Sequence, residues 1–322
     1  MSGSPVIFDL HGKRVFVAGH SGMVGSAIVR RLQREGCDIV TAMRRDLDLR
    51  QSGEVDRFMA QAKADAVFVA AGTVGGIRAN SAFPADFLAD NVAIALNTIR
   101  AAHRAGVKKL VYLGSSCIYP RRAPQPMTPD MLLSGPLEPT NQWYAIAKIA
   151  GIKLCEAFRL QHGADFVSVM PTNLYGPGDN YDSQDSHVPA ALLRRFHEAK
   201  IVDAESATVW GTGTPRREFL AVDDLADACV FVMKRYSDLE FLNIGTGEET
   251  SIAEFARLVA DVVGYPGKFE FDTSQPDGAP HKRLDLSRIT ALGWRATTPL
   301  RDGLMHMYDD FLTRYDAIRA DP

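Results

Sequence analysis

The fold is decided by residues 13–28, KRVFVAGHSGMVGSAI. The β-branched and aromatic run Lys13–Ala18 predicts a buried strand, and Ser26–Glu35 has the composition of a helix. Between them, Gly19–Gly25 has GxxGxxG spacing. Glycines allow a tight turn and a close approach of backbone to a pyrophosphate, and a helix N-terminus supplies N–H donors. The stretch predicts a nucleotide-binding turn; a glycine-rich turn without a ligand is the alternative.

The rest of the first half repeats the strand-and-helix pattern. Buried strands are predicted at 38–42, 65–71, 109–113 and 166–170, with helices at 90–105 and 142–162. Strands that alternate with helices predict an α/β fold, here a Rossmann-type doubly wound parallel sheet. Residues 72–77 form a second glycine-rich turn after a strand, which places backbone near a ligand at the carboxyl edge of the sheet.

Two arginines indicate which nucleotide this turn would bind. The second strand runs into Arg44 and Arg45, whereas NAD-binding proteins often have an acidic residue there for the ribose hydroxyl. Guanidinium groups suit a 2′-phosphate, so the sequence favours NADP(H). Asp46 and Asp48 close by weaken this prediction, and a solvated basic loop is the alternative. A further alternative is that Asp48 and Leu49 line the adenine of the cofactor.

A second set of residues predicts chemistry at a carbonyl group. Ser115 follows a predicted strand, and Tyr144 and Lys148 share one face of the helix 142–162. An ammonium beside a phenol is expected to lower the tyrosine pKa. A serine and a tyrosine hydroxyl could then hold a carbonyl oxygen while hydride moves to the carbon. Alone, the Tyr-x-x-x-Lys spacing is a weak signal.

Composition limits the partners. The chain has 322 residues and a net charge of −3, which fits one large α/β unit with a smaller lobe and gives no reason to expect nucleic acid. Residues 1–9 do not have the pattern of a signal peptide, and no run is apolar enough to cross a bilayer. The four cysteines lack metal-binding spacing, so we expect no metal and a cytoplasmic location.

The second half is expected to bind the substrate. Helices are predicted at 188–199, 223–234, 251–263 and 299–314, with Ser251 and Glu254 forming a capping box. Arginines near glycine turns and Trp210 suit a diphosphate and a base, although a buried tryptophan and surface arginines are the alternative. We expect residues 1–170, with later segments at roughly 215–245, to bind NADP and residues 171–322 to form mainly the substrate lobe.

The glycine spacing, Ser115 and the Tyr144/Lys148 pair resemble the extended short-chain dehydrogenase/reductase family. More narrowly, the chain is similar to members that epimerise and reduce GDP-4-keto-6-deoxymannose, with NADPH as reductant and GDP-L-fucose as product. The stretches that carry this similarity are 19–28, 114–120, 137–156, 170–180, 186–199, 209–226 and 276–285. The resemblance also implies a homodimer through the helices 90–105 and 142–162.

The resemblance assigns roles to individual residues. It implies Ser115, Tyr144 and Lys148 as the reductase residues, Cys117 as the base of the epimerisations and His187 as the acid. The implied cofactor-binding residues are Gly19, Ser21, Gly22, Met23, Val24, Gly25, Arg44, Ala71, Gly72, Lys148, Pro171, Asn173, Leu174 and His187. The implied substrate-binding residues are Arg195, Trp210, Arg217, Asp277 and Lys282. Ser21 departs from the family, because many relatives have a basic residue there.

Elementary chemistry is compatible with these roles. A hexose with a ketone at C4 has acidic protons at C3 and C5, and either enolate places its charge on the same oxygen. From spacing alone, however, Cys117 is as readily explained as a small buried residue as it is as a base. A loop histidine such as His187 is more often solvated than catalytic. The alternatives are a nucleotide-sugar 4-epimerase, a 4,6-dehydratase and a non-catalytic cofactor-binding protein. A dehydratase would have an acidic pair at Ser116 and Cys117.

Overall fold

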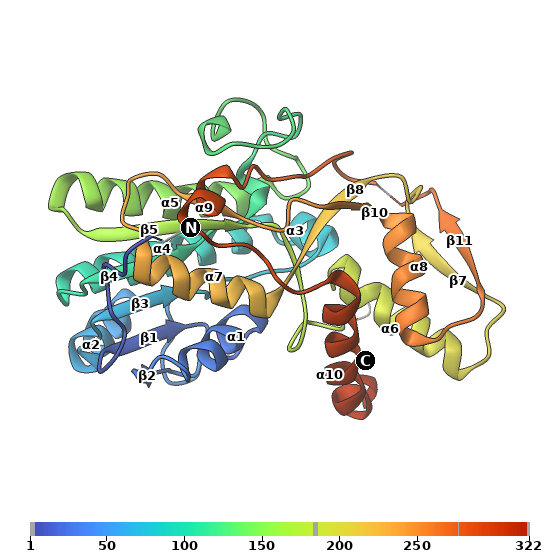
Figure 1. The fold of residues 1–322 in the computed structure, drawn as a ribbon, viewed down its shortest axis with the longest axis horizontal. Coiled ribbons are helices and arrows are strands. Elements are labelled where there is room, and N and C mark those ends of the chain that lie inside the picture. Colours follow the sequence, from blue (N-terminus) through green and yellow to red (C-terminus); the bar gives the residue numbers. More distant parts are fainter. Residues whose placement is uncertain (1–3, 183–185, 276, 321–322) are drawn as a thin grey trace.

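The computed structural model describes residues 4–182, 186–275 and 277–320. Its centre is a six-stranded sheet in the order β2-β1-β3-β4-β5-β9, in which every neighbouring pair is parallel (Figure 1). The strands are β1 (Arg14–Ala18), β2 (Asp38–Val40), β3 (Ala66–Val69), β4 (Lys109–Leu113), β5 (Asp165–Pro171) and β9 (Leu242–Ile244). β3 and β4 are buried along their whole length, as expected of strands covered on both faces.

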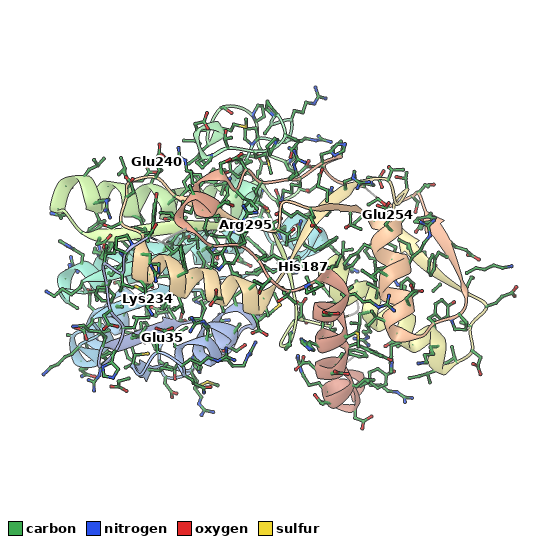
Figure 2. The ribbon with its side chains drawn as sticks, in the orientation of Figure 1. Glu35, His187, Lys234, Glu240, Glu254 and Arg295 are labelled. Atoms are coloured by element: carbon green, nitrogen blue, oxygen red, sulfur yellow. The ribbon has the colours of Figure 1, made fainter. Side chains whose placement is uncertain are left out.

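Helices cover both faces of this sheet (Figure 1). On one face α1 (Met23–Leu32) packs against α7 (Val222–Arg235), and on the other α4 (Pro84–Arg104) packs against α2 (Ser52–Ala62) and α5 (Gln142–His162). The Glu35 carboxylate ties the first pair together, because it accepts from Arg31 and from Lys234 at 2.7 Å each (Figure 2). The predicted doubly wound α/β fold is confirmed.

A second lobe lies beyond the carboxyl edge of the sheet. It contains β6 (Asn173–Tyr175), β8 (Arg216–Ala221) and β10 (Glu249–Ser251) in one small sheet and β7 (Ser206–Trp210) with β11 (Lys268–Asp272) in another. These strands and α6 (Val188–Ile201), α8 (Ile252–Val263) and α10 (Leu300–Ala320) enclose a third apolar core. β6 follows β5 directly, so the lobe is anchored at the sheet edge where β5 ends.

Four short elements complete the described chain. α3 (Ile77–Ala82) precedes α4, and α9 (Ser287–Leu292) packs on β9. Two turns of 3₁₀ helix, η1 (Ser116–Ile118) and η2 (Pro129–Met131), lie in the segment after β4. The predicted 120–140 loop is thus largely irregular, and its Met127 pairs with Leu284 of a segment much later in the chain.

Most predicted elements are present, with shifted ends. The predicted helices 26–35 and 90–105 begin earlier, at Met23 and Pro84, and the final helix extends to Ala320. α2 is absent from the predictions because it buries only Val55 and Met59, which gives a weak apolar pattern. The predicted capping box is confirmed: Ser251 accepts from the Glu254 backbone, and Glu254 accepts in return. None of the described helices is long and apolar enough to cross a membrane.

Candidate active site

The glycine turn between β1 and α1 is packed backbone against backbone. Gly19 has φ +84°, and a Cβ there would lie 2.6 Å from the Ala71 nitrogen at the end of β3. A Cβ on Gly25 would meet the Gly19 carbonyl oxygen. Gly22 is the N-cap of α1 and, within the described chain, no side chain caps this helix. The helix N-terminus therefore offers backbone N–H donors and a cradle without Cβ atoms, which suits a pyrophosphate.

Other predicted cofactor residues flank this turn. Met23 and Val24 open α1 and are half-buried, whereas Ser21 is exposed. Gly72 follows Ala71, and a Cβ there would lie 3.7 Å from Lys148 Nζ. On the far side, Pro171 is buried at the end of β5. Asn173 starts β6 and donates to the Glu218 carbonyl at 2.8 Å, with Leu174 next to it.

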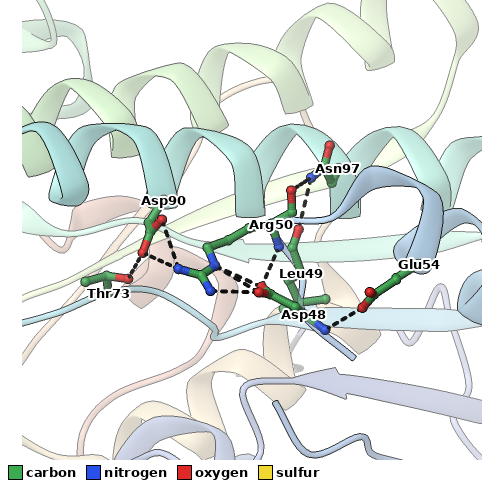
Figure 3. A network of polar contacts seen from close by, with 7 residues as sticks. All are labelled: Asp48, Leu49, Arg50, Glu54, Thr73, Asp90 and Asn97. Atoms are coloured by element: carbon green, nitrogen blue, oxygen red, sulfur yellow. Dashed lines mark hydrogen bonds and ion pairs between the residues drawn. The ribbon is translucent and has the colours of Figure 1, made fainter. Parts of the chain in front are cut away.

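A cavity of about 400 Å³ lies where β2 and β3 end, and Arg44 and Arg50 line it. Arg50 is held by two carboxylates: Asp48 at 2.7 Å and Asp90 at 3.2 Å (Figure 3). The hydrogen bond from Arg50 is the main reason that the Asp48 pKa is lowered. Asp48 is thus ion-paired with Arg50. The charge of Arg44 also contributes to the lowered Asp48 pKa, but Arg44 makes no ion pair among the described residues. Arg44 is left as the cation that could take a 2′-phosphate.

Tyr144 and Lys148 lie one turn apart on α5, at the carboxyl edge of the sheet. Lys148 Nζ donates to the Leu113 carbonyl at 2.9 Å and lies 5.6 Å from the centre of the Tyr144 ring. The lysine is 5% exposed, so its position is fixed by the surrounding protein. Ser115 follows β4 two residues after Leu113, which brings the serine, the tyrosine and the lysine to one edge.

The electrostatics of this pair differ from the prediction. Burial lowers the pKa of Lys148 to about 8. Burial also raises the pKa of Tyr144, and charge on Cys117 raises it further. The predicted lowering of the tyrosine pKa is therefore wrong for this structure, because desolvation penalises the phenolate and weakens the neighbouring ammonium. Tyr144 is held in its protonated form.

Cys117 lies in η1, the turn that directly follows Ser115. The Ser115 hydroxyl oxygen accepts from the Cys117 backbone N–H at 3.3 Å and so caps this turn. The sulfur accepts from Asn141 Nδ2 at 3.3 Å and from Lys282 Nζ at 3.6 Å. Cys117 is half-buried. It is therefore a polar group at the site edge rather than a core residue.

His187 is the N-cap residue of α6, in the middle of the molecule between the sheet and the second lobe (Figure 2). His187 is exposed to solvent. Partial desolvation of the imidazole nevertheless lowers its pKa, and the charge of Lys282 lowers it further. Lys282 therefore contacts Cys117 and also acts on His187 through its charge.

Arg195 and Trp210 form one wall of a second cavity of about 640 Å³. The Arg195 guanidinium lies 5.2 Å from the Trp210 ring centre and donates to the Thr208 carbonyl at 2.7 Å. Trp210 is 49% exposed, which excludes the alternative that it is a core residue. An exposed ring backed by an arginine suits a stacked base.

Two other predicted substrate residues, Asp277 and Arg217, lie close to the turn that follows β7. The Asp277 carboxylate accepts from the Thr212 N–H at 2.7 Å and from its hydroxyl at 2.9 Å. Arg217 donates to the Asp277 carbonyl at 3.3 Å. Asp277 thus orients the turn after β7 and the Arg217 side chain.

Sequence reasoning missed Asn141, Arg50 and Asp90. Asn141 precedes α5 directly, a position where an asparagine side chain usually caps the helix. An asparagine expected to cap a helix gives no reason to predict a contact with a cysteine sulfur. Arg50 and Asp90 are separated by 40 residues, so only the fold brings them together.

These features define a nucleotide-dependent enzyme of the extended short-chain dehydrogenase/reductase type. Residues 15–245 match the NAD dependent epimerase/dehydratase family, and the chain belongs to it.

Individual relatives are more specific. The chain is 56% identical to GDP-L-fucose synthase 1 of Arabidopsis thaliana, over 93% of each chain. It is 51% identical to GDP-L-fucose synthase of Escherichia coli K12, over 96% of this chain and 99% of that one. Its fold matches a GDP-L-fucose synthetase from Naegleria fowleri bound to NADP, with a TM-score of 0.88, 26% identity and 98% of each chain covered.

Proposed function

We propose that this protein converts GDP-4-keto-6-deoxy-D-mannose into GDP-L-fucose, by epimerisation at C3 and C5 followed by NADPH-dependent reduction at C4. The observation that carries the proposal is the position of Cys117: its sulfur lies beside Ser115 and near Tyr144 and Lys148, with Lys282 linking it to His187. A reductase needs only the first three side chains. The relatives named GDP-L-fucose synthase support the same substrate.

The C4 oxygen is the common point of all three steps. The Ser115 and Tyr144 hydroxyls would hold this oxygen while Cys117 removes the proton from C3 or C5, so that the enolate charge is stabilised. His187 would return a proton on the opposite face, which inverts the carbon. Its lowered pKa makes the imidazolium a rarer but stronger acid.

The last step needs a proton donor at the same oxygen. Tyr144, whose pKa is raised by burial, is protonated at neutral pH and would give its proton to the C4 oxygen. When bound, NADPH supplies the hydride that reduces C4. Reduction then converts the ketone into a hydroxyl, and the tyrosine regains its proton from solvent.

The cofactor residues predicted above fit this role. The glycine turn with Gly19, Ser21, Gly22, Met23, Val24 and Gly25 would hold the pyrophosphate, and Arg44 the 2′-phosphate. Ala71, Gly72, Lys148, Pro171, Asn173, Leu174 and His187 would line the nicotinamide side. The supporting observations are the cradle that Cβ atoms would fill and the unpaired guanidinium of Arg44.

The GDP moiety would lie in the second lobe. Trp210 would stack on the base, and Arg195 and Arg217 would contact the diphosphate, with Asp277 orienting Arg217. We accordingly propose that residues 1–170, with later returning segments, bind NADP and that residues 171–322 mainly bind the GDP-sugar.

The test is product analysis with purified protein, NADPH and GDP-4-keto-6-deoxymannose. We expect loss of the 340-nm absorbance and one product whose NMR couplings show the L-galacto configuration. A product reduced at C4 but unchanged at C3 and C5 would overturn the epimerase part. UDP-glucose serves as the control, because turnover of it would indicate a 4-epimerase.

We also propose a cytoplasmic homodimer that pairs through α4 and α5. The apolar side chains of Leu96, Ile146 and Leu160 are exposed on these two helices, and the four cysteines are unpaired. Sedimentation equilibrium should give twice the chain mass, whereas a monomer at micromolar concentration would contradict the proposal.

A further inference from the structure

We propose that Lys282 is a positioning residue that holds Cys117 as a thiolate, with Asn141 as the second hydrogen-bond donor. This inference rests on the proposed function, in which Cys117 is the base. The resemblance predicts Lys282 only as a substrate-binding residue, and it gives Asn141 no role.

The contacts of the sulfur carry the inference. Two N–H groups donate to Cys117 Sγ, from Asn141 at 3.3 Å and from Lys282 at 3.6 Å. Across the described parts of the chain, no acceptor takes a hydrogen bond from this sulfur. A thiol has one proton to donate, whereas a thiolate accepts from several donors. The surroundings therefore match the ionised form, which is the form that removes protons.

The backbone that follows Lys282 is held in place from two directions. On one side the Arg283 N–H donates to Gln125 Oε1 at 2.7 Å, and the Met127 N–H donates to the Arg283 carbonyl at 2.8 Å. On the other side the Leu284 N–H donates to the buried carboxylate of Glu218 at 3.0 Å. The residues that follow Lys282 are thus fixed by the 120–140 loop and by β8, which gives that long loop a function.

Asn141 is also well placed. It lies immediately before α5, the helix that carries Tyr144, and its Nδ2 group points at the sulfur. Its amide oxygen is buried and accepts from no described residue. The hydrogen bond from Nδ2 to the Cys117 sulfur is therefore the only one described for the Asn141 side chain.

The Lys282 ammonium has opposite effects on the two proposed epimerase residues, Cys117 and His187. A positive charge at Lys282 favours a negative sulfur by Coulomb attraction and disfavours a positive imidazole at His187. A single lysine thus favours the thiolate at Cys117 and adds to the burial that lowers the His187 pKa.

The test is alkylation of Cys117 by iodoacetamide in the substrate-free protein. Lys282→Gln should slow alkylation at pH 7 about tenfold or more, because an opposite charge nearby strongly favours the ionised form. Cys117→Ser gives the background from the other cysteines, and Asn141→Ala should slow alkylation about threefold, the effect of a neutral hydrogen bond.

Two control variants separate this role from a structural one. Arg283→Gln removes a charge from the next residue, and that side chain makes no described hydrogen bond to the sulfur, so alkylation should stay within twofold. Lys282→Arg keeps the charge and should restore most of the rate. Equal thermal midpoints for Lys282→Gln and the natural protein would show that the fold is intact.

The outcomes also separate this inference from the proposed function. Unchanged alkylation in Lys282→Gln, together with a raised KM for the sugar, would overturn the inference and leave Lys282 as a substrate contact. If alkylation falls as expected but the natural protein exchanges no hydrogen at C3 or C5, the proposed function fails and the thiolate role stands.

Discussion

The two groups of side chains that we propose to act on the sugar are built in opposite ways. Tyr144 and Lys148 lie on one turn of α5, whereas Cys117 meets a lysine 165 residues further along the chain. The first group is fixed by helix geometry alone. The second exists only because the 120–140 loop, the end of η1 and the segment before Leu284 come together in the folded protein. Local spacing can therefore predict a reductase, but the epimerase residues depend on tertiary structure.

The two groups also differ in charge. Lys148 is buried and Tyr144 is half-buried, and desolvation shifts the pKa values of both toward the neutral forms. Cys117 and Lys282 are half-exposed and lie next to each other, which suits a pair of opposite charges. A neutral proton donor is what reduction needs, and a negative base is what epimerisation needs. The following predictions test whether this contrast holds.

The largest expected effect is on the reductase group. Tyr144→Phe removes the proton donor, and we expect the rate of NADPH oxidation to fall about 10³-fold. NADPH binding, measured by fluorescence titration, should change less than threefold, because the ring that packs beside Lys148 is kept. A residual rate above one tenth of the natural rate would show that another group protonates the oxygen.

A smaller effect is expected at Ser115, whose hydroxyl is proposed to serve both the epimerisations and the reduction. Ser115→Ala removes one of the two hydroxyls proposed to hold the C4 oxygen, so both exchange at C3 and C5 and reduction should slow about 10²-fold. Rapid-quench measurements of each step give the two rates. Loss of only one step would mean that the oxygen site is not common to them.

The smallest effect concerns stability. The folded-state pKa of Lys148 is about 8, well below its ordinary value, so between about pH 8 and 10.4 the unfolded chain binds more protons. Burial of the charge therefore destabilises the fold fully below pH 8, and stability recovers as pH rises through this window. Lys148→Met should be the more stable protein at pH 7, by up to about 3 kcal/mol, and the advantage should disappear near pH 10.5.

Urea denaturation of the cofactor-free protein at a series of pH values measures this difference. Lys153→Met is the matched control, because this lysine is exposed on the same helix and its substitution removes no buried charge. A difference between Lys148→Met and the natural protein that is flat with pH would contradict the burial effect.

The fold was predictable because its signals are local. The buried strands are short apolar runs, α5 has the limits that its pattern indicates, and Ser251 with Glu254 forms the expected capping box. α2 was not predicted, because a helix that buries only two side chains shows little apolar periodicity in its sequence. β8 was not predicted either, because its first residues, Arg216 and Arg217, are not typical of a strand. Its pairing with β6 and β10 forms only within the folded second lobe.

The site was predictable to a smaller degree. Ser115, Tyr144 and Lys148 carry a spacing that physical chemistry explains, but the sign of the tyrosine pKa shift depends on burial, which spacing does not reveal. Asp90, one of the two carboxylates that hold Arg50, lies 40 residues away, and the two donors to the Cys117 sulfur lie 24 and 165 residues away. Such contacts require the folded chain.

The central claim is that the two groups perform separable steps on one sugar. The most direct test compares Cys117→Ser and Tyr144→Phe in deuterated water, with deuterium at C3 and C5 and NADPH oxidation measured in the same reaction. The account predicts that Cys117→Ser loses most of the exchange. Tyr144→Phe should slow reduction more than exchange, because it removes the proton donor of the reduction but only one of the two hydroxyls that hold the C4 oxygen. Equal loss of exchange and reduction in both variants would contradict it.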